Sequence, residues 1–129
     1  GHLGLTPQSV HQLGGYRLQG RDSAQASAIQ SQAEALERAG CCALVLEKVP
    51  ARLAAMIAQQ LSIPVIGIGA GADVDGQVLV SQDMLGMEES FSPKFLRRFG
   101  AVGTAIRQAT SDYIAAVKER SFPTIDESY

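Results

Sequence analysis

The sequence predicts an α/β fold built on parallel strands. Two apolar runs without alternation, residues 43–46 and 64–68, are typical of strands that are covered on both faces. A one-sided helical pattern precedes each run, and the connections between helices and strands are short. This order of elements indicates βαβ units, whose right-handed crossovers make the strands parallel.

The first forty residues are expected to supply a strand end, a loop and a helix. Residues 1–5 resemble the end of a strand, and residues 6–9 have the chemistry of a turn. Asp22 is suited to cap a helix, because Gln25 follows it in capping-box spacing. Gly40 suits the position just past the end of this helix. The side chains expected on its buried side are Ile29, Ala33 and Leu36.

The rest of the chain is expected to add a helix, two strands and then only helices. A helix over residues 51–61 precedes the strand at 64–69, and residues 78–80 predict one more strand. Helices are expected at 93–99 and 104–122. The expected buried stripe of the helix at 51–61 is Leu53, Met56, Ile57 and Leu61.

Composition limits the possible classes of function. The chain is 46% hydrophobic and 19% charged with a formal net charge of −2, so it lacks the basic surface that nucleic acids require. Its apolar stretches fall far short of the ~20 residues that span a bilayer, and no membrane partner is expected. Cys41 and Cys42 are adjacent and have no other cysteine to pair with, which favours reduced thiols in a cytoplasmic protein. The chain starts without Met at what resembles a strand end, so a partial chain is expected.

Glu47 is the candidate catalytic residue. It follows a buried apolar run and stands where the strand stops, at the edge of the sheet where α/β enzymes carry ligand-contacting residues. A carboxylate in such a desolvated position can act as a general base. The alternative is a structural ion pair with Lys48 or Arg52.

A glycine-rich segment follows the second apolar run. Its glycines, Gly67, Gly69 and Gly71, either form a ligand-facing loop, where backbone N–H groups approach an anion or substrate, or allow tight packing at the strand end. Their spacing is neither the dinucleotide fingerprint nor a P-loop. The sequence leaves both roles open.

The remaining candidates are a histidine and two aspartates. His2 lies at another strand end, where it could hydrogen-bond a substrate oxygen or have a purely structural role. Asp73 and Asp75 are two residues apart, but the other oxygen ligands of a calcium loop are absent, which favours turn residues. No metal site is therefore expected from the residues of this chain.

Five motifs in order resemble the ketopantoate hydroxymethyltransferase family. They read GHLGLTPQS at residues 1–9, GGY through QGR at 14–21, LVLE with VP at 44–50, IPVIGIGAG at 63–71 and DGQVLV at 75–80. The resemblance implies a (β/α)₈ TIM barrel of the phosphoenolpyruvate mutase/isocitrate lyase kind. At 129 residues the chain is too short for a whole barrel of ~250 residues. It would be the C-terminal half, a single domain over residues 1–129 with the end of strand five, strands six to eight and the C-terminal helices.

The resemblance also implies a reaction in pantothenate biosynthesis. A hydroxymethyl group passes from 5,10-methylenetetrahydrofolate to 3-methyl-2-oxobutanoate, which gives 2-dehydropantoate (ketopantoate). Mg²⁺ would chelate the 2-oxo acid, Glu47 would match the proton acceptor, and His2 would match a residue near the substrate. The metal ligands would lie in an N-terminal half that this sequence lacks, so the isolated chain is expected to be inactive. A cytoplasmic homo-oligomer, commonly a decamer, is also implied.

A different class of function stays open beside the enzyme. A non-catalytic half-barrel could serve as a binding or assembly module, with the loop at residues 67–71 holding an anion. Its unpaired strand edges would then be covered by a partner.

Overall fold

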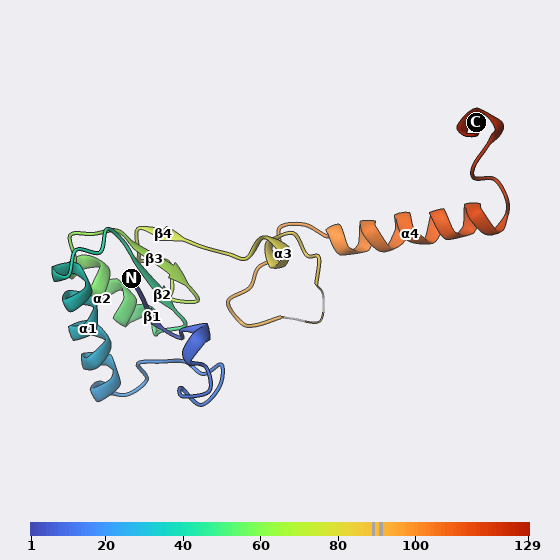
Figure 1. Ribbon diagram of the computed structural model, residues 1–129. Coiled ribbons are helices and arrows are strands. Elements are labelled where there is room, and N and C mark those ends of the chain that lie inside the picture. The colour runs from blue at the N-terminus through green and yellow to red at the C-terminus, as the bar shows by residue number, and fades with distance from the viewer. Residues whose placement is uncertain (89, 91) are drawn as a thin grey trace. The chain divides into compact units, whose positions relative to one another are not determined.

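A computed structural model describes residues 1–88, 90 and 92–129 (Figure 1). The chain divides into two compact units, Gly1–Leu79 and Val80–Tyr129. The single domain expected over residues 1–129 stays a prediction.

A four-stranded parallel sheet forms the centre of the first unit. Its strands lie in the order β1-β2-β3-β4. The bounds of these strands are β1 His2–Gly4, β2 Leu44–Glu47, β3 Val65–Ile68 and β4 Gly76–Gln77. The predicted α/β fold with parallel strands is therefore confirmed.

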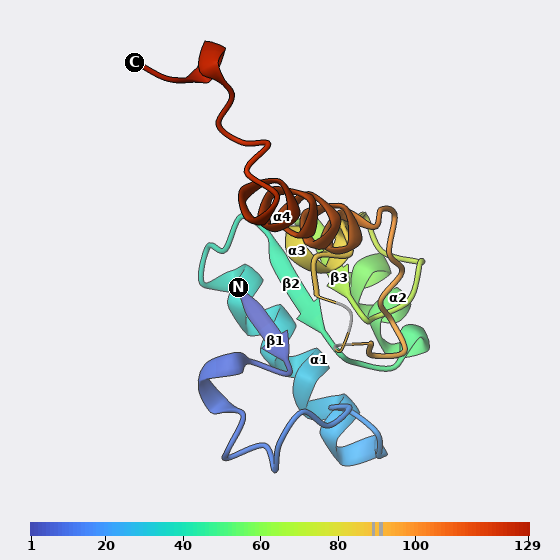
Figure 2. The ribbon, with the colours of Figure 1, turned by 90° about the vertical axis from the view of Figure 1, so that its right-hand side faces the viewer.

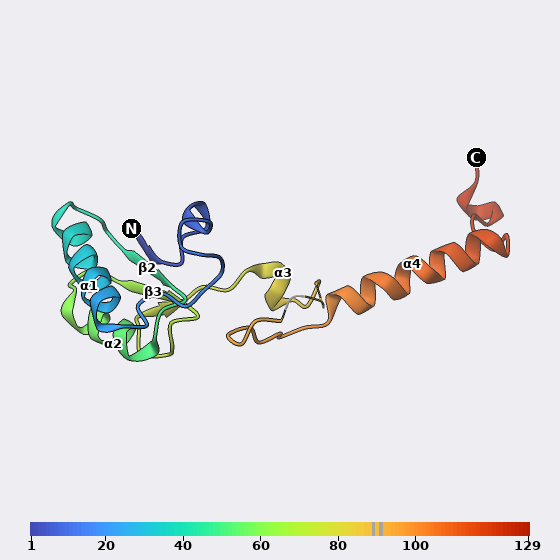
Figure 3. The ribbon, with the colours of Figure 1, turned by 90° about the horizontal axis from the view of Figure 1, so that it is seen from below.

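Two helices connect the first three strands. A short 3₁₀ helix, η1 (Pro7–Ser9), follows β1, α1 (Ser23–Arg38) leads into β2, and α2 (Ala51–Gln60) leads into β3. Figure 2 shows β1, β2 and β3 side by side with both helices behind them, and Figure 3 shows the same arrangement from below. The sheet of this unit thus has one face that carries α1 and α2 and one that does not.

The start of α1 confirms the predicted cap. Asp22 accepts a hydrogen bond from the Gln25 amide at 2.8 Å. The Gln25 side chain in turn accepts from the Gly20 and Arg21 amides rather than from the amide of the cap residue itself. At the other end, Gly40 has φ +93°, the left-handed conformation expected just past a helix. The Asp22 cap and Gly40 therefore mark the two ends of this helix.

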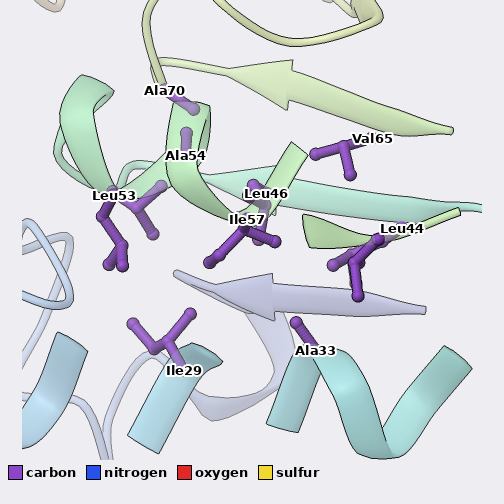
Figure 4. Close-up of a cluster of buried hydrophobic side chains, with 11 residues drawn as sticks. Ile29, Ala33, Leu44, Leu46, Leu53, Ala54, Ile57, Val65 and Ala70 are labelled. Carbon is purple, nitrogen blue, oxygen red and sulfur yellow. The ribbon is translucent and has the colours of Figure 1, made fainter. Parts of the chain in front are cut away.

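The core fills the space between the sheet and the two helices (Figure 4). Leu44, Leu46 and Val65 from the strands are fully buried against residues of α1 and α2. The helical members are Ile29, Ala33, Leu53, Ala54 and Ile57. Leu53, Ile57 and Leu61 are buried as expected, whereas Met56 is 45% exposed and Ala54 is buried in its place.

The opposite face of the sheet is only partly covered. Val45, Ile66 and Ile68 alternate with the core residues and are half-buried. The apolar runs predicted the strands correctly, and coverage of their second face stays a prediction for the complete protein.

The last strand of the sheet lies two residues earlier than expected. The prediction placed it at residues 78–80, whereas β4 is Gly76–Gln77. The Val78 amide still donates to the Gly67 carbonyl at 2.9 Å, and the ladder ends there. Val78 and Val80 are exposed, so their apolar side chains do not mark a buried strand.

The second unit contains helices. They are α3 (Ser81–Met84), α4 (Val102–Lys118) and a 3₁₀ turn, η2 (Ile125–Glu127). The helix expected at 104–122 is present as α4, displaced toward the N-terminus. The helix expected at 93–99 is wrong: one turn forms, with Leu96 bonded to Pro93, and the Phe99 amide then donates to the Met84 carbonyl instead.

Candidate active site

Glu47 is the last residue of β2 and lies on the sheet face without helices. Neighbouring residues of a strand point to opposite faces, and Leu46 points into the helix-covered core. The Glu47 side chain is 20% exposed. It is thus partly desolvated and still reachable, as a general base must be.

His2 lies beside Glu47. Its Nε2 atom is 3.1 Å from Oε2 of Glu47, and its side chain is 33% exposed. The sheet register explains the contact, because His2 pairs with Val45 and Gly4 pairs with Glu47, which places all four residues on one face. Gly4 has no side chain, so no group of β1 separates the imidazole from the carboxylate.

The contact between His2 and Glu47 is close but is not an aligned hydrogen bond. The Nε2 atom is buried, yet among the described residues it has no hydrogen-bond partner of suitable geometry.

The backbone at the end of β2 is fixed from both sides. The Leu5 amide donates to the Glu47 carbonyl at 2.8 Å, and the Lys48 amide donates to the Ile68 carbonyl at 2.8 Å. Gly4 has φ +87°, and a Cβ atom there would lie 2.2 Å from the Glu47 carbonyl oxygen. Only glycine permits this approach, so Gly4 belongs to the structure that holds Glu47 in place.

The predicted alternative for Glu47, an ion pair with Lys48 or Arg52, does not form in the described part of the chain. The Lys48 ammonium donates instead to the Tyr16 carbonyl. The partner of Glu47 comes from a strand far away in sequence, at the position where the sequence suggested a substrate contact.

The glycine-rich segment is shaped by packing at two of its three glycines. A Cβ atom on Gly71 (φ +87°) would lie 2.4 Å from Cβ of Ala51, at the start of α2. One on Gly67 would lie 3.0 Å from the Val74 side chain, on the helix side of the sheet. Gly69 has φ +63°, which favours glycine irrespective of any ligand. Ligand contact by this segment stays a prediction.

The described residues do not fit a magnesium site of their own. Mg²⁺ demands an octahedral set of oxygen ligands, and no group of three or more His, Cys, Asp or Glu side chains gathers among residues 1–88, 90 and 92–129. Asp75 already accepts from the Val65 amide at 2.8 Å, which closes the start of β3. The Mg²⁺ implied by the resemblance would need its ligands from elsewhere.

A cavity of about 320 Å³ lies close to β1 but is separate from the candidate site. Leu3, Gly4, the segment after β1 and α1 line it. Neither His2 nor Glu47 is among its lining residues. Leu3 also packs against the core, which places this cavity on the helix side.

Sequence comparison matches nearly the whole chain to a known family. A sequence profile described as ketopantoate hydroxymethyltransferase matches residues 1–125. The chain belongs to the ketopantoate hydroxymethyltransferase family. Family membership, with the parallel strands, confirms the prediction that the chain is part of a (β/α)₈ barrel.

Curated relatives in the ketopantoate hydroxymethyltransferase family carry the name 3-methyl-2-oxobutanoate hydroxymethyltransferase. Those of Anaeromyxobacter dehalogenans, Parabacteroides distasonis and Methylobacillus flagellatus are 55%, 54% and 57% identical over all 129 residues. The chain spans 42%, 47% and 49% of the lengths of these relatives. It therefore corresponds to less than half of each of these proteins.

Two features of the candidate site cannot be predicted from the sequence of this family member. The His2–Glu47 contact depends on strand register, and the sequence suggests Lys48 only as an ion-pair partner of Glu47. The positive φ of Lys48, 52°, gives no signal in the sequence, because lysine rarely adopts it. No helix in the described ranges is long and apolar enough to cross a membrane.

Proposed function

We propose that the complete protein transfers a hydroxymethyl group from 5,10-methylenetetrahydrofolate to 3-methyl-2-oxobutanoate, with Glu47 as the proton acceptor. Family membership supports the reaction. The position of Glu47 supports its role, since this carboxylate lies at the C-terminal end of a parallel strand and faces away from the helices.

The chemistry assigned to Glu47 is removal of the proton at C3 of the 2-oxo acid. The electron pair of the broken C–H bond forms an enolate, which makes a C–C bond to the methylene carbon of the folate. Both C–N bonds of that carbon break and water supplies its hydroxyl group. The proton from C3 and the second proton of water end on the two nitrogens of tetrahydrofolate. His2 contacts Oε2 of Glu47 and so orients the carboxylate.

In this proposal, the groups that the reaction needs are divided between this chain and an N-terminal half. In the same proposal, the four parallel strands of the chain take the places of strands five to eight and carry the proton acceptor. The groups that bind the 2-oxo acid and Mg²⁺ belong, in this proposal, to an N-terminal half outside this chain. The chain alone is then inactive. We place the active protein in the cytoplasm as a homo-oligomer, consistent with the family resemblance.

Replacement of Glu47 by Gln in the complete protein tests the proposal. Glutamine keeps the shape but cannot accept the proton, so kcat should fall about 10²–10⁴-fold. Formation of ketopantoate is the assay, and thermal unfolding checks that the fold is unchanged. Retention of wild-type turnover by Glu47→Gln would instead favour a non-catalytic binding module, in which the side chain has no chemical role.

A further inference from the structure

The loop between β1 and α1 is tied to the strand ends at Leu5, directly after β1, and again over residues 16–19. Over residues 16–19, the hydrogen bonds to the strand ends in the described structure all involve Lys48. Its ammonium donates to the Tyr16 carbonyl, and its own carbonyl accepts from the Gln19 amide at 3.0 Å. The other bonds of this stretch are local, such as the Arg17 amide to the Gly15 carbonyl. Lys48 therefore anchors residues 16–19 of this loop to the sheet.

Lys48 holds this position in an unfavourable backbone conformation. Its φ of 52° is uncommon for a residue with a side chain. Three bonds, to Ile68, Gln19 and Tyr16, hold it there. Because Lys48 directly follows Glu47, its bonds to Tyr16 and Gln19 hold the loop at the C-terminal rim of the sheet, next to the proposed proton acceptor.

This anchored loop presents an aromatic ring and positive charge at the C-terminal rim of the sheet. The Tyr16 side chain is 73% exposed. Arg17 is exposed and has no ion-pair partner among the described residues. The Lys48 ammonium bonds to a neutral carbonyl, so its charge is not cancelled. This local positive charge stands out in a chain whose formal net charge is −2.

We propose that this loop binds the folate co-substrate, with Lys48 as its positioning residue. The inference rests on the proposed function. Tyr16 stacks on a ring of the folate, and Arg17 attracts its glutamate carboxylates. The folate is the better fit of the two substrates, because the small 2-oxo acid must lie within reach of Glu47, whereas the longer folate extends across the rim.

Steady-state kinetics of the complete protein test this inference. Arg17→Gln should raise KM for 5,10-methylenetetrahydrofolate about fivefold, the effect of losing one exposed charge pair. Lys48→Met, which also releases the loop, should raise it about tenfold. Both variants should leave kcat and KM for the 2-oxo acid within about twofold of wild type, the pattern of a lost binding contact. Lys48→Arg, which keeps the charge, should recover most of the affinity.

Two further measurements separate binding from general damage. Trypsin should cut after Arg17 faster in Lys48→Met than in wild type, since the loop has lost its tie to the sheet. Lys94→Met, a change at an exposed lysine in the second unit, should alter neither the cutting nor any kinetic constant.

The outcomes distinguish the two proposals. If wild-type protein forms no product from the two substrates, the proposed function fails and this inference fails with it. If wild type is active but Arg17→Gln and Lys48→Met keep the wild-type KM for the folate, only the inference is overturned. Equal increases in KM for both substrates would also overturn it.

Discussion

At the scale of single residues, the candidate site depends on two neighbours of the carboxylate. His2 places an imidazole 3.1 Å from Glu47, and Gly4 leaves the room that this contact needs. The sequence predicts Glu47 because a strand end can be read locally. It cannot predict the His2 contact, because that contact follows from which residues of β1 and β2 stand side by side.

Gly4→Ala should destabilise the protein strongly. The new Cβ atom would lie 2.2 Å from the Glu47 carbonyl oxygen, in addition to the left-handed strain at φ +87°. Gly15→Ala is the matched control, since it has φ +95° but no atom within 4 Å of its Cβ position. We expect about 1–2 kcal/mol of strain for Gly15→Ala and a larger loss for Gly4→Ala. Equal losses in urea unfolding would show that the close approach to Glu47 is unimportant.

The C-terminal turn should depend on pH. The amide and hydroxyl of Thr124 bond to the Glu127 carboxylate at 2.8 and 3.0 Å and hold the pKa of Glu127 below its ordinary value. A lowered pKa means that these bonds favour the turn above the ordinary carboxyl range and are lost as the pH falls through the lowered pKa. A carboxyl NMR titration should show this low midpoint, and Thr124→Val should move it upward. An unchanged midpoint in Thr124→Val would argue against the hydroxyl bond.

At the scale of elements, the two faces of the sheet serve different purposes. Leu44, Leu46 and Val65 bind the helices to the strands, while Glu47 and His2 point the other way. Along β2, core residues thus alternate with the residues that face the candidate site.

Leu46→Ala should cost about 2–5 kcal/mol, because it leaves a cavity between β2 and the helices. Met56→Ala in α2 should cost much less, although the helical periodicity of the sequence predicted a buried Met56. Urea unfolding followed by circular dichroism compares the two variants. Similar costs would mean that Met56 is buried in solution.

The sequence located α1, α2 and the first three strands within one or two residues, because their signals are local, whereas β4 does not overlap the range expected for it. Asp22, Gly40 and the apolar runs mark the ends of α1 and the strands. The failures have another origin. The segment at 93–99 begins with a good helix signal at Pro93, but the Phe99 amide bonds to the Met84 carbonyl, a partner that only the tertiary structure supplies.

At the scale of the whole molecule, the chain spans less than half the length of the relatives it matches. β1 and β4 end the sheet of the first unit, and each has a neighbour on one side only. Unpaired strand edges are prone to association. The 42–49% coverage of the relatives suggests what would pair with these edges: the rest of a longer chain.

Mixing the separately prepared halves should restore activity. The chain alone should form no ketopantoate, and adding an N-terminal half from a close relative should restore turnover if the halves close a barrel. A mixture with the Glu47→Gln chain should assemble without turnover. Turnover by the chain alone would contradict this account.

The alternation along β2 has a consequence for how this protein can change. A single inserted residue before Glu47 would slip the strand by one position, so that the carboxylate turned toward the hydrophobic interior and a leucine took its place at the mouth of the site. Folding and function would then be lost in the same event. This short stretch can accept substitutions one by one, but a change in its length would reverse which side chains face the core.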